Sequence, residues 1–124
     1  MKAVPRTRSV VPEFERRLRE ARRKVWGTVA ATDAELETLE AHQAGEPADD
    51  AATAGVAAVL GKLEGRERHL LDEIDAAQAR LSAGTFGACE RCGKPIRLAR
   101  LRAVPTTRLC IACERGAERD GRRG

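Results

Sequence analysis

The chain has 124 residues, which is room for one small domain or for a small globular unit with an extended element, and too few for a large two-domain enzyme. Apolar residues make up 42% of the sequence, aromatic residues only 2% and charged residues 34%. With so few bulky side chains to fill a wide core, this composition favours long helices over a sandwich or barrel. The formal net charge of +4 is compatible with a nucleic-acid partner but does not establish one.

The sequence contains no run of about 18 apolar residues, and its opening segment lacks the uninterrupted apolar stretch of a secretory signal. We therefore expect a cytoplasmic protein with no membrane association. Its four cysteines should stay reduced there, which favours a metal site over disulfides.

Residues 1–11 are predicted to form a flexible basic arm, and Pro12 suits the first turn of a helix. From there to about residue 42, apolar or small side chains recur at alternating steps of four and three, which is the heptad pattern of a coiled-coil seam. We expect the helix to continue through Gly27, which interrupts the run of good helix formers. The seam consists of Phe14, Leu18, Ala21, Val25, Val29, Thr32, Leu36 and Leu39.

A sharp connection is predicted over residues 44–50, where Gly45 suits a helix C-cap and Pro47 suits the first turn of a new helix. The glycines at 55, 61 and 65 should make the tip-proximal part of this second helix the easiest to bend. Its seam, which ends before Gly84, consists of Val56, Leu60, Leu63, Glu67, Leu70, Ile74, Ala77 and Leu81.

Two consecutive helices that each carry one narrow apolar stripe can bury those stripes only against one another. Residues 12–84 are therefore predicted to form a long antiparallel coiled-coil helical hairpin with its tip at about residues 43–50. Residues 1–24 hold nine basic side chains, whereas residues 33–50 hold seven acidic ones and no Lys or Arg. The hairpin would thus have a basic base and an acidic tip, although each charged block could also be no more than a solvated helix face.

The cysteines follow the pattern C-x2-C-x17-C-x2-C, a spacing typical of a structural zinc site with four thiolate ligands: Cys89, Cys92, Cys110 and Cys113. Two redox-active C-x-x-C pairs, or free buried thiols, are the alternatives. We expect one structural Zn²⁺ in a zinc finger over residues 85–115, followed by a basic C-terminal tail at 116–124. Its apolar cluster would be Phe86, Pro95, Ile96, Leu98, Leu101, Val104 and Leu109.

The remaining candidate residues suggest no catalysis. His42 and His69 are far from the cysteines in sequence and are expected to be solvated helix residues, while Trp26 should cover the opposing helix. No phosphate-binding loop, nucleophile elbow or Ser/His/Asp set is present, so we expect a protein that is not an enzyme.

The segment from Phe86 to Cys113 resembles the DksA/TraR-type zinc finger. It carries an F-G-x-C-x-x-C-G opening, an R-L-x-A-x-P-T core from Arg100 to Thr106 and an L-C-x-x-C close. The predicted hairpin before it is the family's other hallmark. This resemblance implies a mainly α fold and a bacterial transcription regulator that binds RNA polymerase directly, without specific DNA contact. It also implies that the hairpin enters the polymerase secondary channel and alters open-complex stability and initiation.

The resemblance also implies site residues. The family's tip carries the pattern D-x-x-D-x-A, and here Asp49 and Ala51 match it while Glu46 stands in place of the first Asp. With Asp50, which lies between them, the expected tip effector residues are Glu46, Asp49, Asp50 and Ala51. The family's basic residues on the second helix, candidates for polymerase contacts, fall at Lys62, Arg66 and Arg68.

Some family members bind ppGpp through basic residues at positions that are Glu73, Val104 and Glu114 here. Because acidic or neutral side chains suit a polyphosphate poorly, we expect the protein to act without ppGpp at that site. We also expect it to be a monomer. Two other functions stay open: a zinc-ribbon module that binds nucleic acid, and a coiled-coil adaptor for another protein. The lack of aromatic stacking residues argues against the former.

Overall fold

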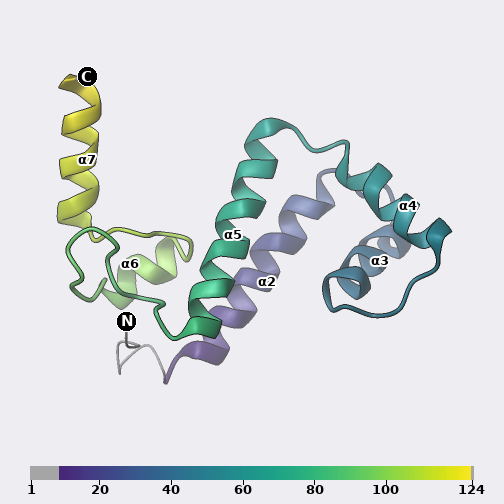
Figure 1. Cartoon of the computed structure of the whole chain (residues 1–124), viewed down its shortest axis with the longest axis horizontal. Coiled ribbons are helices and arrows are strands. Elements are labelled where there is room, and N and C mark those ends of the chain that lie inside the picture. The colour runs from purple at the N-terminus through teal and green to yellow at the C-terminus, as the bar shows by residue number, and fades with distance from the viewer. Residues whose placement is uncertain (1–8, 124) are drawn as a thin grey trace. The chain divides into compact units, whose positions relative to one another are not determined.

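The computed structural model describes residues 9–123, so most of the predicted basic arm lies outside the described residues. The described chain is mainly helical, as predicted (Figure 1). Its one sheet-like feature is an isolated antiparallel bridge between Ala88 and Pro95. Over residues 9–123, no helix is long and apolar enough to cross a membrane. The helices are α2 (Val11–Gly27), α3 (Asp33–Gln43), α4 (Asp50–Leu60), α5 (Gly65–Ala83), α6 (Leu98–Ala103) and α7 (Ile111–Arg123).

The first predicted arm is divided into two helices, α2 and α3. The expectation that the helix continues through Gly27 is wrong, because α2 ends at that residue. Thr32 adopts an extended backbone and its side chain accepts a hydrogen bond of 3.1 Å from the backbone N–H of Glu35. The Glu35 carboxylate in turn accepts one of 2.7 Å from the N–H of Ala31. These caps satisfy backbone donors that a helix start leaves free, so they favour a new helix at Asp33.

The second predicted arm is also divided, into α4 and α5, with residues 61–64 between them. This break falls at Gly61 and Gly65, within the part that the sequence marked as easiest to bend. The placement of Pro47 in a first helical turn is wrong, since α4 begins only at Asp50. The start is set instead by Asp49, whose carboxylate accepts a 2.7 Å hydrogen bond from the N–H of Ala52.

The chain divides into two compact units. The first, which we call the central unit, consists of residues 19–72. Within it, α3 and α4 pack against each other (Figure 1). Its core is a cluster of buried residues surrounded by partly buried ones: Trp26, Leu39, Val56 and Val59, with Val29, Ala30, Leu36, Leu60 and Leu71.

Trp26 is a packing residue, 5% exposed, and the Arg22 guanidinium lies 5.7 Å from the centre of its ring. An ion pair between Arg23 and Glu40 links α2 to α3. The placement of Leu70 in the buried seam is wrong, because this side chain is 44% exposed. Its neighbour Leu71 packs against the cluster instead.

The second, which we call the terminal unit, has residues 9–18 and 73–123 as its described part. The rings of Phe14 and Phe86 lie 4.9 Å apart and tilted, a favourable arrangement for two aromatic side chains. Glu13 accepts hydrogen bonds from Arg102 on α6 and from Arg17, which lower the pKa of its carboxyl to about 2. The unit's buried side chains include Phe14, Leu18, Ile74, Ala77, Phe86, Ile96 and Leu101.

Phe14 is the larger of the two α2 side chains that are fully buried in this core. We expect Phe14→Ala to lower the free energy of unfolding by roughly 3–5 kcal/mol, because a large cavity would replace the ring. Urea unfolding of the zinc-loaded protein measures this. The neighbouring exposed residue provides a control, since Glu15→Ala should change stability by no more than about 0.5 kcal/mol. Equal effects of the two substitutions would contradict the packing described.

Candidate metal centre and acidic turn

The four cysteines of the sequence pattern meet at one point in the terminal unit. Their sulfur atoms all lie within 4.8 Å of one another, and those of Cys92 and Cys110 are 3.9 Å apart. A tetrahedral Zn²⁺ with Zn–S bonds of about 2.3 Å requires sulfurs about 3.8 Å apart, so a small contraction would complete the geometry. The cofactor that fits this cluster is one structural zinc ion, as predicted.

The first cysteine pair lies in a tight turn. The N–H of Gly93 donates to the carbonyl of Cys89 at 2.8 Å, and the N–H of Cys89 donates to the carbonyl of Lys94 at 2.9 Å. Gly93 has a φ of +77°, a backbone conformation that side chains with a Cβ rarely adopt. The turn therefore depends on this glycine to aim both sulfurs in one direction.

The second pair lies at the start of α7, where Cys110 precedes the helix and Cys113 is in its first turn. Burial raises the pKa of the Cys89 thiol, but backbone hydrogen bonds from Cys110, Cys92 and Arg91 outweigh it and bring the pKa to about 6. For Cys113, the neighbouring Cys110 side chain is the largest of the causes that raise the pKa to about 12. The Cys89 thiol therefore loses its proton readily, whereas the neighbouring cysteines oppose deprotonation of Cys113. A bound cation is needed to stabilise all four thiolates together.

Three arginines, Arg108, Arg100 and Arg91, make contacts that the sequence did not predict and that connect the parts of this unit. Arg108 donates to the Glu73 carboxylate at 3.2 and 3.4 Å and to that of Glu90 at 3.3 Å. Arg100 donates to the carbonyl of Leu109 at 3.0 Å and pairs with Glu114 at 3.8 Å.

Arg91, between the first two cysteines, contacts α7. It donates to the carbonyl of Cys113 at 3.4 Å and to Asp120 at 3.3 Å. A Cβ at Gly116 would lie 3.3 Å from its guanidinium, so the glycine leaves room for the arginine. The residues predicted as a basic tail, 116–124, belong to this helix up to Arg123.

The predicted apolar cluster around the cysteines is only partly buried. Phe86, Ile96 and Leu101 are at most 3% exposed, whereas Val104 is 44% exposed and Pro95 is also exposed. Leu98 and Leu109 lie between these extremes. The core of this end of the chain is therefore small, which fits a unit that needs its metal in order to fold.

The predicted tip residues lie together in and beside the connection between α3 and α4. Gly45, with φ +80°, ends α3 in a Schellman motif, in which the N–H of Glu46 donates to the carbonyl of Ala41 at 3.1 Å. Glu46, Asp49, Asp50 and Ala51 are all exposed. Asp49 has a structural role as well, because it caps α4.

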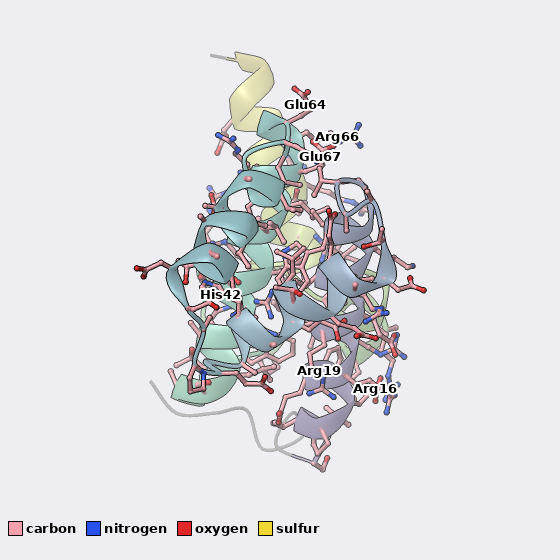
Figure 2. All side chains as sticks on the ribbon, turned by 90° about the vertical axis from the view of Figure 1, so that its right-hand side faces the viewer. Arg16, Arg19, His42, Glu64, Arg66 and Glu67 are labelled. Carbon is pink, nitrogen blue, oxygen red and sulfur yellow. The ribbon has the colours of Figure 1, made fainter. Side chains whose placement is uncertain are left out.

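The predicted polymerase-binding residues lie around the α4–α5 break and are all exposed. Lys62 is in the break, and Arg66 is in the first turn of α5, beside Glu64 and Glu67 (Figure 2). Arg68 donates to the carbonyl of Gly61 at 3.2 Å, so it also helps to end α4. The structure thus gathers these three residues, but at a helix junction and not along one continuous helix.

Of the positions matching the family's ppGpp site, Glu73 and Glu114 pair with Arg108 and Arg100, while Val104 is exposed. His42 and His69 are exposed, as expected for solvated helix residues.

Comparison with known proteins agrees with the zinc site. The family model for the prokaryotic dksA/traR C4-type zinc finger matches residues 84–119. An uncharacterized protein of Aquifex aeolicus is 44% identical over 62 residues, which are 50% of this chain and 43% of the relative. The RNA polymerase-binding transcription factor DksA of Haemophilus influenzae is 45% identical over 53 residues, 43% of this chain and 37% of the relative. The matched segments thus span less than half of these relatives.

Solved structures extend the likeness to most of the chain. The structure of transcription factor DksA2 from Pseudomonas aeruginosa is 30% identical, has a TM-score of 0.61 and covers 92% of this chain and 87% of its own. An RNA polymerase binding protein and transcriptional regulator from Chlamydia trachomatis shares the fold, with 21% identity and a TM-score of 0.55 over 90% of this chain and 91% of its own. The chain belongs to the DksA/TraR family.

We expect the purified protein to contain one zinc ion per chain. Cys110→Ser should lose the metal and melt the terminal unit, because three thiolates leave the coordination incomplete and the small core cannot fold alone. Elemental analysis and thermal unfolding measure the two effects. Ala112→Ser is the matched control, since it introduces the same residue at an exposed position two residues away. A metal-free wild-type protein with full thermal stability would contradict the assignment.

Proposed function

We propose that this protein is a transcription regulator that binds bacterial RNA polymerase directly. In this proposal, the hairpin of residues 12–84 enters the secondary channel, and its acidic turn alters open-complex stability and initiation. The observation that carries it is the exposed turn of three carboxylates, Glu46, Asp49 and Asp50, in a chain of a family whose relatives are named as RNA polymerase-binding factors.

The charge at this turn supports an effector role. Among the described residues, no basic side chain is paired with Glu46 or Asp50. One carboxylate oxygen of Asp49 accepts a hydrogen bond from the N–H of Ala52, and the other oxygen has no partner among these residues. Carboxylates that are neither buried nor neutralised remain available to a partner's cations and donors. We assign Glu46, Asp49, Asp50 and Ala51 to this effector turn.

We assign the polymerase contacts outside the turn to Lys62, Arg66 and Arg68. All three are exposed and lie within seven residues of each other at the α4–α5 break. Exposed charges of this kind mainly affect the association rate and the salt dependence of binding. They should have little effect on what the acidic turn does once the protein is bound. Binding and effect should therefore be separable by substitution.

Asp49 allows the two roles to be separated, because asparagine and serine cap helices about as well as aspartate. We expect Asp49→Asn and Asp49→Ser to bind polymerase within about twofold of wild type while losing the change in open-complex lifetime. Asp49→Ala should also lose the cap, at a cost of about 1 kcal/mol of helix stability. Competition binding to polymerase and open-complex lifetime are measured on the same variants.

Lys62→Ala and Arg66→Ala should show the opposite pattern: weaker binding, a defect masked at high protein concentration, and weaker salt dependence. Lys24→Ala removes one exposed positive charge elsewhere and is the matched control. Equal loss of binding and effect in Asp49→Asn would make the turn an anchor. Full retention of both would make it a solvated surface, as in an adaptor protein.

The internal ion pairs of the terminal unit lead us to propose that ppGpp does not act at the family's site here. Glu73 and Glu114 place negative charge at two matching positions and form ion pairs with Arg108 and Arg100. A polyphosphate would have to displace those carboxylates.

We therefore expect ppGpp to change the protein's effect on open-complex lifetime by less than about twofold, after correction for its effect on polymerase alone. A large, saturable increase that disappears in Glu114→Gln would overturn this prediction.

A further inference from the structure

The central unit is packed in a way that its heptad pattern does not predict. Trp26 and Leu39 belong to one apolar cluster, although in a continuous helix they would be about 20 Å apart. The Arg23–Glu40 pair, 17 residues apart, is likewise impossible in a continuous helix. We call this arrangement, defined by Trp26, Leu39, Val56 and Val59, the clustered packing.

The clustered packing leaves parts of the seam unsatisfied. Leu70 occupies a seam position in the four-three pattern but is 44% exposed. Among the described residues, one oxygen of Glu67 is buried without a hydrogen-bond partner, which carries a desolvation cost. Conversely, Trp26, Val59 and Leu71 pack in the cluster although none of them is in the pattern.

The breaks between the helices are short. After α2, the N–H of Ala30 still donates to the carbonyl of Trp26 at 2.9 Å, a helical bond, so the chain departs from helix only near Ala31 and Thr32. After α4, the N–H of Gly61 donates to the carbonyl of Ala57 at 2.9 Å, and the backbone N–H of Arg68 donates to the backbone carbonyl of Glu64 at 3.0 Å. A change of backbone at a few residues in each arm would make both arms continuous.

We propose that the central unit exchanges between the clustered packing and a continuous hairpin, in which residues 28–32 and 61–64 are helical and Leu70 enters the seam. The two forms bury different members of the same sequence, Trp26 and Val59 in one and Leu70 in the other. The exchange is a property of the free protein. Its consequence for binding rests on the proposed function. If the polymerase channel admits only the continuous hairpin, the apparent affinity of the protein for polymerase equals its intrinsic affinity multiplied by the fraction of chains in that form.

The chain carries its own probe, because Trp26 is the only tryptophan and is 5% exposed in the clustered packing. In the continuous hairpin it flanks the seam at Val25, without its cluster partners. The exchange therefore exposes Trp26 and adds helix at the same time. Simple loosening of the cluster would expose Trp26 but lose helix, so fluorescence and circular dichroism together distinguish the two.

The test variant is Thr32→Ala. Thr32 has an extended backbone and caps α3 in the clustered packing, whereas in the continuous hairpin it lies inside a helix. The substitution removes the cap and replaces threonine by the better helix former alanine, so it should shift the equilibrium roughly tenfold toward the continuous hairpin. The matched control is Thr53→Ala, at an exposed position that is already inside α4.

We expect the test variant, in the absence of polymerase, to shift the Trp26 emission to longer wavelength, to increase its quenching by acrylamide and to increase the helical signal at 222 nm. Val59→Ala should do the same, and adding Leu70→Ala to the test variant should reverse the shift. The control variant should leave Trp26 shielded. Unchanged Trp26 emission in the test variant and in Val59→Ala, or exposure of Trp26 with loss of helix, would overturn the exchange and leave the proposed function untouched.

Discussion

The need to hold four thiolates at one centre is the constraint on which the terminal unit depends. Four sulfurs within 4.8 Å of one another concentrate negative charge that a divalent cation stabilises. The turn at Cys89, the start of α7 and the contact of Arg91 with Cys113 all lie where the first cysteine pair meets the second. A zinc ion bound there would join Cys89 and Cys92 to Cys110 and Cys113, in addition to the small apolar core and the long-range contacts of Glu13 and Arg108.

The zinc site was predictable because ligand spacing is a local property of the sequence, whereas the helix breaks depend on competition between alternatives. A heptad pattern states which side of a helix is apolar, but it does not state that the helix continues. The local signal for a new helix was present in Thr32 and Glu35, which have the S/T-x-x-E spacing of a capping box, and in Asp49 as an N-cap. Reading these signals would have placed the starts of α3 and α4.

Other features were beyond sequence reasoning because they join distant residues. The contacts of Arg108 with Glu73 and Glu90, and of Glu13 with Arg102, bring together positions as far apart as 89 residues. Nothing in the local sequence distinguishes these arginines from solvated ones. The same holds for Trp26 and Val59, whose burial depends on how α3 and α4 pack.

The proposed polymerase contacts at Lys62, Arg66 and Arg68 and the acidic turn both lie in the central unit, at two different helix connections, which suits the proposed regulator with separate anchoring and effector residues. The most direct measurement of this function is binding of the zinc-loaded chain to core RNA polymerase in the absence of nucleic acid, repeated with competitor duplex DNA. We predict saturable binding that the DNA does not reduce. Absence of binding to polymerase, together with binding to the DNA itself, would contradict it.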